Sequence, residues 1–217
     1  MKKHTIAALL FFGATLLPAM AQDGKTQLTV LTPMKSIVGT PKPPIWPNLD
    51  KTPQKHPKLF VPKGTTNLAA KKTVTSSDKI PIVGELTYIT DGEKLADEGY
   101  EVEFAPGPQW VQIDLEKVGE IYAIAVWHFH RQERAYKAVV VQISNDPTFK
   151  SGVTTVFNAD FQNLHKLGAG SDKTYVETFL GKVIPVNAVK GRYVRLYSAG
   201  NTSDQGNHYV EVEVYGI

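Results

Sequence analysis

The sequence predicts an all-β protein with two packed sheets over about residues 67–217, preceded by an extended arm. Short runs in this part alternate apolar and polar residues, and a period of two is typical of strands with one buried face. Turn-forming clusters separate the runs: "TDGE", "APGP", "SNDP" and "SAGN". No segment longer than ten residues has a convincing helical period of 3.6. Many short strands with frequent turns favour a two-sheet β-sandwich.

The first 21 residues are predicted to be a secretory signal peptide. Lys2 and Lys3 precede an apolar run, and Ala19 and Ala21 stand where a signal peptidase needs small residues. The run is too short for a membrane anchor. Cleavage after Ala21 would deliver the protein to the periplasm or the exterior. The chain has no cysteine, which excludes disulfides and a thiol-linked lipid.

Residues 22–66 are predicted to form a Pro/Lys-rich arm. Eight of the fourteen prolines lie between Pro33 and Pro62, and this density is incompatible with a helix. After one possible strand at "KTQLTVL", an extended polyproline-like course is expected. Several side chains are too apolar for a purely solvated linker, so parts of the arm should lie along the body: Ile37, Val38, Ile45, Trp46, Leu59 and Phe60.

Charge is distributed unevenly along the chain. Residues 25–72 hold nine lysines against the single acid Asp50, whereas residues 73–217 hold 13 basic and 19 acidic residues. An acidic body argues against nucleic acid as a partner. The arm is interpreted as a self-repelling linker, and contact with an anionic surface or polymer is the alternative.

Within residues 67–217, the alternation defines the expected core positions. In "QWVQIDL" (109–115) the apolar side carries Val111, Ile113 and Leu115. The β-branched run "AVVVQIS" (138–144) follows. "RYVRLYS" (192–198) turns Val194 and Leu196 inward, and "HYVEVEVYGI" (208–217) does the same with three valines: Val210, Val212 and Val214.

Seven motifs in order resemble the discoidin-like, or coagulation factor V/VIII type C, family. They are "NLAAKKTVTSSD", "ITDGE", "QWVQIDL", "IYAIAVWH", "VVVQISND", "KGRYVRLYS" and "EVEVYG", and together they span residues 67–217. The family includes the galactose-binding-like modules of family 32 carbohydrate-binding proteins. The resemblance implies a jelly-roll sandwich, ligand-binding loops at one end and, in many members, a structural calcium ion nearby.

Two segments depart from the family pattern. "EKLADEGYEVEF" (93–104) is longer and more acidic than the usual turn, and residues 161–185 are long and rich in turn formers. Because such loops set specificity in binding proteins, the particular ligand cannot be carried over from the resemblance.

The stretch "VWHFHRQERAY" (126–136) is the leading candidate for a binding loop. Sugars need an apolar face together with hydrogen-bond donors such as arginine, and this stretch offers both. By analogy, the loop 198–209 would face the same pocket. Trp127 and Phe129, on the other side of the strand, are expected in the core. The predicted ligand-binding residues are His128, His130, Arg131, Arg134, Tyr136, Asn201, Asn207 and His208.

Two alternatives stay open for this stretch. His128 and His130 could point to one side of a strand and bind zinc or iron, but the spacing to Glu133 does not fit a cupin-like site. Alternatively, His128 and Tyr136 belong to the core and Arg134 pairs with Glu133.

Calcium is the expected cofactor, in a structural role. Calcium prefers hard oxygen ligands, and a glycine turn presents carbonyl groups. Asp91 before Gly92, and Glu211 on the last strand, match the family's calcium positions, with Asp97 as a further ligand. A solvated strand face at Glu211 and a plain turn at Asp91 are the alternatives.

No enzyme motif is present: the chain lacks G-x-S-x-G, H-E-x-x-H and P-loop patterns. The sequence thus predicts a secreted, non-catalytic module that binds a glycan or polysaccharide, of galactose type or another terminal sugar. The second hypothesis is a module that docks on another exported protein or on the cell envelope.

Overall fold

The computed structural model describes residues 24–217, and the predicted signal peptide lies outside them. The part described is all-β apart from one short 3-10 helix, η1 (Leu86–Thr90). The predicted two-sheet sandwich is confirmed. No helix within residues 24–217 has the length and apolar character needed to cross a membrane.

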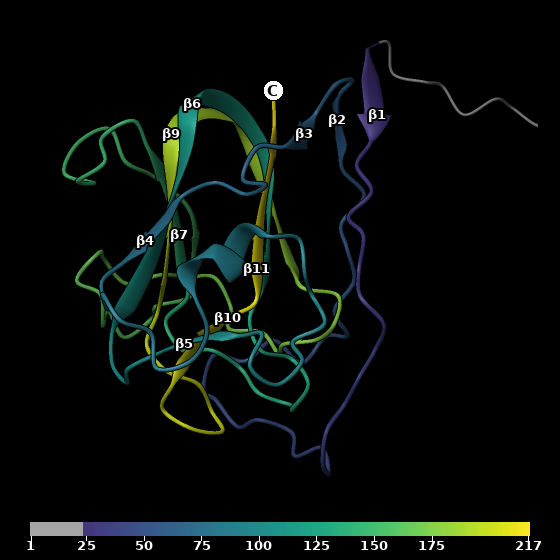
Figure 1. Cartoon of the computed structure of the whole chain (residues 1–217), viewed down its shortest axis with the longest axis vertical. Coiled ribbons are helices and arrows are strands. Elements are labelled where there is room, and N and C mark those ends of the chain that lie inside the picture. The colour runs from purple at the N-terminus through teal and green to yellow at the C-terminus, as the bar shows by residue number, and fades with distance from the viewer. Residues whose placement is uncertain (1–23) are drawn as a thin grey trace, which may run out of the picture.

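Two long strands form the backbone of the sandwich, β6 (Gln109–Trp127) and β9 (Lys182–Ser198). They pair antiparallel along most of their length, with register shifts near 114–119 and 121–123. Figure 1 shows both strands arching over one end of the molecule, so that their two halves belong to opposite sides of the core. Bulges of this kind bend a sheet and increase its twist.

The remaining strands attach to this pair. The order of the main sheet is β3-β11-β6-β9-β7-β8, and β4 also pairs with β6. β10 and β5 form a separate two-stranded sheet. The bounds are β3 Thr66–Asn67, β4 Val74–Ser76, β5 Val102–Phe104, β7 Val140–Ser144, β8 Thr154–Asn158, β10 Asn207–Tyr209 and β11 Glu211–Gly216.

The alternating apolar residues form the main core, as predicted, except that Val210 belongs to a second cluster. Val111, Ile113, Leu115, Val194, Leu196, Val212 and Val214 are buried there. β11 differs from the expected half-buried strand because all six of its residues are buried, including Glu211 and Glu213. A second cluster on the outer face of β6 and β11 explains this difference: Trp127 and Tyr215 pack there against Leu28, Val30 and Leu59 of the arm.

The arm is ordered against the sandwich. Its neck is a pair of short antiparallel strands, β1 (Lys25–Gln27) and β2 (Phe60–Pro62), so the predicted first strand is present. Between them the chain runs down the side of the sandwich to the end opposite the β6–β9 arch and returns (Figure 1). Trp46 packs edge-on against Phe161, with ring centroids 6.0 Å apart.

Candidate ligand pocket

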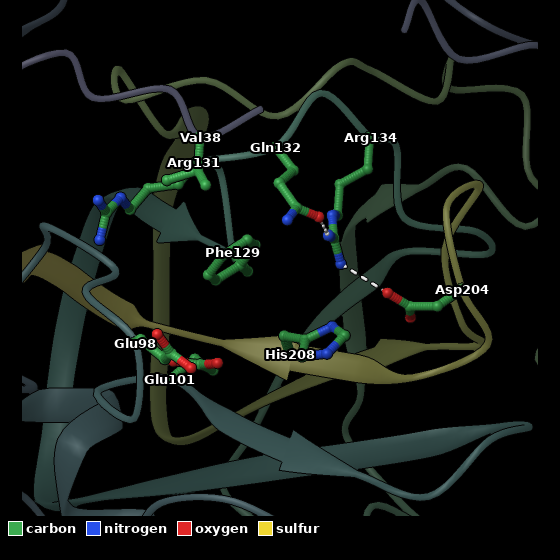
Figure 2. A pocket seen from close by; sticks show the side chains of 9 residues that line it. All are labelled: Val38, Glu98, Glu101, Phe129, Arg131, Gln132, Arg134, Asp204 and His208. Atoms are coloured by element: carbon green, nitrogen blue, oxygen red, sulfur yellow. Dashed lines mark hydrogen bonds and ion pairs between the residues drawn. The ribbon is translucent and has the colours of Figure 1, made fainter. Parts of the chain in front are cut away.

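A pocket of about 520 Å³ lies where the segment after β6, the loop before β5, β10 and the arm meet. Figure 2 shows the side chains around it, with Phe129 between the arginines and the two glutamates. The lining residues are Val38, Glu98, Glu101, Phe129, Arg131, Gln132, Arg134, Asp204 and His208. Arg131, Arg134 and His208 belong to the predicted site.

Phe129 provides the aromatic surface of the pocket. It was expected in the core on the opposite side of the strand from the histidines, and the structure reverses this arrangement: Phe129 is half-buried and lines the pocket, while His128 and His130 are buried. β6 ends at Trp127, so the strand period no longer determines which side chains point inward. The expected core position of Trp127 is confirmed.

Each pocket arginine is held by a carboxylate. Nη1 of Arg134 donates to Oδ2 of Asp204 at 2.9 Å, and its Nη2 donates to Oε1 of Gln132 at 2.5 Å. Arg131 donates through Nη1 to Oδ1 of Asp97 at 2.5 Å. Arg134 thus pairs with Asp204 and not with Glu133. Nε of both arginines is buried and has no hydrogen-bond partner within residues 24–217.

His208 forms the floor of the pocket, on β10. Its Nδ1 shares a hydrogen bond of 2.9 Å with the hydroxyl of Tyr136, which is itself buried behind the pocket. Burial lowers the pKa of His208 to about 4, against a weaker opposing effect of Asp204. The ring is therefore neutral near pH 7, and its Nε2, 3.7 Å from Oε1 of Glu103, is free of a short contact.

The two other predicted histidines serve the interior. Nδ1 of His128 lies 2.6 Å from Oε1 of the buried Glu177, and its ring stacks on Tyr136 with centroids 4.3 Å apart. His130 donates through Nε2 to the carbonyl of Lys94 at 2.8 Å, and burial lowers its pKa. His128 and Tyr136 therefore follow the core alternative. Within residues 24–217, no group of three metal-binding side chains includes the histidine pair.

The two predicted asparagines brace loops and do not line the pocket. Nδ2 of Asn201 donates to Oδ1 of Asp204 at 2.6 Å and to the carbonyl of Gly206 at 2.9 Å. Nδ2 of Asn207 donates to the carbonyls of Ala105 and Gly107, at 2.8 and 3.0 Å. Their contribution to the pocket is to hold the loop that carries Asp204.

Sequence reasoning missed the acidic side of the pocket and its wall from the arm. Glu98 and Glu101 come from the long acidic loop that departs from the family pattern. The sequence indicated that this loop is unusual, but not that it borders the pocket. Val38 reaches the rim because its backbone N–H donates to the carbonyl of Arg131 at 2.7 Å. No sequence pattern indicates that backbone contact.

The three predicted calcium ligands do not form one cluster of side chains. Among residues 24–217, no three His, Cys, Asp or Glu side chains lie together, as a metal site built from side chains alone would require. Asp97 pairs with Arg131. Asp91 is exposed, and its Oδ1 accepts a hydrogen bond from the backbone N–H of Glu93 at 2.8 Å.

Of the three predicted calcium ligands, Glu211 is the one with a buried carboxylate oxygen that lacks a partner within residues 24–217. Its side chain is fully buried, Oε2 accepts from the N–H of Gly92 at 3.0 Å, and Oε1 has no partner among residues 24–217. Burial raises its pKa to about 9. Nearby, the ammonium of Lys94 pairs with Glu213 at 2.7 Å and bonds the carbonyl of Leu31.

Comparison with known proteins identifies the fold. No family model and no curated protein matches the chain. Among solved structures, the family 32 carbohydrate-binding module of NanJ from C. perfringens, in complex with galactose, matches with a TM-score of 0.50 and 13% identity, covering 70% of this chain and 97% of that module. CpGH89 from Clostridium perfringens matches with a TM-score of 0.50 and 16% identity, over 69% of this chain and 14% of the enzyme.

A chitosan-binding module from the chitosanase/glucanase of Paenibacillus sp. IK-5 also matches, with a TM-score of 0.47 and 24% identity over 70% of this chain and 99% of that one. At identities of 13–16%, the similarity to the NanJ module and CpGH89 shows the fold and not the ligand. The chain has the discoidin-type, galactose-binding-like β-sandwich fold.

Proposed function

We propose that the protein is a non-catalytic carbohydrate-binding module whose pocket is the one built around Phe129. The observation that carries the proposal is a half-buried aromatic ring that lines the pocket, flanked by hydrogen-bonding side chains from the segment after β6 and from β10: Arg131, Gln132, Arg134 and His208. A pyranose has an apolar C–H face and a rim of hydroxyls, and this arrangement complements both. The NanJ module, with the same fold, was solved in complex with galactose.

The charges around the pocket favour neutral or amino sugars over acidic ones. Arg131 and Arg134 are already paired with Asp97 and Asp204, whereas Glu98 and Glu101 are in no ion pair within residues 24–217. Carboxylates accept hydrogen bonds from hydroxyl or ammonium groups and repel a second carboxylate. With few contacts, free sugars should bind with a Kd on the order of 10⁻³–10⁻⁵ M.

A glycan array probed with residues 22–217, followed by calorimetry on the best sugar, tests the proposal. Phe129→Ala and Arg131→Ala should each weaken binding at least about tenfold, because each removes a direct contact. Arg192→Ala is the matched control: Arg192 is also paired, with Asp114 at 2.7 Å, but does not line the pocket. Unchanged affinity in both pocket variants would refute the site.

The docking hypothesis remains the second candidate, supported by the arm. Several of its apolar side chains are exposed, including Leu31 (73%), Met34 (79%) and Ile45 (93%). Exposed apolar side chains of this kind mark protein-binding surfaces when they gather in a patch. A blank array combined with a stable complex between the protein and another exported protein, lost in an Ile45→Ser variant, would favour docking over glycan binding.

We also propose a structural calcium ion at Glu211. The supporting observation is a buried carboxylate oxygen, Oε1, without a partner; Asp91 and backbone carbonyls of the adjoining turn would be the remaining ligands. An ion there would brace the turn against β11. Calcium should raise the melting temperature and a chelator should reverse the effect, but neither should affect Glu211→Gln. An unchanged melting temperature of the parent protein would exclude the ion.

Export is the last part of the proposal. The charged start, apolar run and small residues at Ala19 and Ala21 support a cut after Ala21. Expression of the full chain in a bacterial host, followed by N-terminal sequencing, should give a chain that starts at Gln22. A cytoplasmic product that retains Met1 would contradict export.

A further inference from the structure

Two adjoining hollows lie between the returning limb of the arm and the segment before β9. The larger, of about 660 Å³, is bordered by residues 50–55 of the arm and by Tyr175, Val176, Thr178 and Lys182. The smaller, of about 400 Å³, shares five of these lining residues: Pro53, Gln54, Glu133, Val176 and Thr178. We call the two together the arm groove. The proposed sugar pocket shares no lining residue with the groove.

Hydrogen bonds between arm and body fix the walls of the groove. The backbone N–H of Asp50 donates to the carbonyl of Thr174 at 2.7 Å, and the N–H of Thr174 donates to the carbonyl of Asn48 at 3.0 Å. Gln54 closes the other end: its Nε2 donates to the carbonyl of Gly181 at 3.2 Å, and its Oε1 accepts from the hydroxyl of Thr178 at 2.6 Å. The groove is therefore preformed, and binding would need little ordering of the chain.

The rim of the groove carries free positive charge. Lys51, Lys55 and Lys182 border the larger hollow and Lys35 the smaller, and none of the four is in an ion pair within residues 24–217. Three acids also border the groove: Asp50, which accepts hydrogen bonds from Thr52, Glu133, which is in no ion pair within residues 24–217, and Glu177, which is paired with His128. The ammonium of Lys182 lies over the ring of Tyr175, 5.0 Å from its centroid. The four lysines leave a small positive excess at the rim, which attracts anions.

We propose that the arm groove is a second binding site, for a saccharide unit that carries a carboxylate or sulfate group. The lysines would hold the anion. Pro53 and Val176 offer apolar surface to the ring, and Thr52 can bond its hydroxyls. The groove extends the proposed function, because the charges of the sugar pocket disfavour acidic sugars.

Calorimetry with residues 22–217 tests the groove in two separate titrations. The probes are a galacturonic acid trimer for a carboxylate and a heparin-derived hexasaccharide for a sulfate. The double variant Lys51→Gln/Lys55→Gln should weaken binding at least about tenfold at low salt, and less at high salt because the contribution is electrostatic.

The control is Lys42→Gln/Lys58→Gln, which removes the same charge from arm lysines outside the groove. Its affinity should stay within about twofold of the parent, since screened charges far from the ligand contribute little. Equal losses in both double variants would mean binding by a diffuse polycation and would overturn the proposal. Failure of both probes to bind would also overturn it.

Two further results separate the groove from other interpretations. Phe129→Ala should leave the affinity for the acidic saccharide unchanged; a loss would place that ligand in the sugar pocket and overturn the proposal, whatever the fate of the proposed function. A poly-glutamate peptide should bind more weakly than either saccharide. Equal or tighter binding of the peptide would assign the groove to acidic proteins instead.

Discussion

The sandwich and the arm are ordered by different forces. The sandwich is held by a buried core, in which side chains such as Ile113, Ile124 and Leu196 are fully excluded from solvent. Much of the arm is exposed, Ile45 to 93%, and much of its course is fixed by backbone and side-chain hydrogen bonds to the body, such as those from the N–H of Val38 to Arg131 and from Gln54 to Gly181. Burial of apolar area dominates folding energetics, whereas one hydrogen bond adds little net stability. The two regions should therefore respond very differently to substitution.

The largest effect is expected at Trp127, where the sandwich face meets the arm. The ring is fully buried, and its Nε1 donates to the carbonyl of Phe179 at 3.1 Å. Trp127→Ala should lower the free energy of unfolding by about 3–5 kcal/mol, as measured by urea denaturation. Trp110→Ala is the control, because that ring is only half-buried and lies against Arg195. A loss below about 1 kcal/mol at Trp127 would mean that this face contributes little to the fold.

Gly181 shows how closely the neighbouring loop approaches this ring. Its φ is +67°, and a Cβ added there would lie 2.4 Å from Cε2 of Trp127. A side chain would require both an unfavourable left-handed backbone and a displaced indole ring. The loop that carries Gly181 also accepts the hydrogen bond from Gln54, so Trp127 supports one wall of the arm groove.

Strand alternation predicted the sandwich well because that period reflects burial directly. Val111, Ile113 and Leu115 point inward as expected, since β6 is regular there. The same rule failed at Phe129, which lies two residues beyond the end of β6 at Trp127. The strand period no longer predicts orientation once the strand has ended, and most residues that line the candidate pocket lie in such irregular segments.

Three of the eight predicted ligand-binding residues line one pocket in the structure: Arg131, Arg134 and His208. The sequence did not indicate that Glu98 and Asp204 line the same pocket, because loop geometry decides which polar side chains meet. The wall from the arm at Val38 depends on a backbone hydrogen bond, which any residue except proline could make. Sequence patterning carries no record of such contacts.

An intermediate effect is expected from the titration of Glu211, on the strand between the core and the arm. Its pKa is raised from an ordinary 4.5 to about 9, so the folded state favours the protonated form. This contribution to stability is complete below about pH 4.5 and is lost as the pH rises through 9. In the presence of a chelator, the free energy of unfolding should therefore fall between about pH 5 and 9, by at most about 1.4 kcal/mol per pH unit. The melting temperature should fall over the same pH range.

Glu211→Gln should flatten this pH dependence, because the amide does not titrate. Glu116→Gln, at an exposed carboxylate, is the control and should leave the slope as it is. A slope that is identical in the parent protein and in Glu211→Gln would show that another group causes it. Calcium bound to the ionised carboxylate would reduce the slope in the parent protein alone, which links this measurement to the proposed metal site.

The smallest effect is expected from the arm itself. Leu59 is half-buried in the cluster around Trp127, and its carbonyl accepts from the N–H of Leu28 at 2.8 Å. Leu59→Ala should lower the free energy of unfolding by about 1 kcal/mol or less, because a partly exposed side chain loses less apolar burial than a core residue. Hydrogen exchange should quicken at the amide of Leu28 and stay unchanged in β6, since local opening need not involve the core. Phe60→Ala, at a side chain 54% exposed, serves as the control. Faster exchange throughout β6 in Leu59→Ala would show that the arm and the sandwich unfold as one cooperative unit. The two regions would then differ in their local contacts but not in their stability.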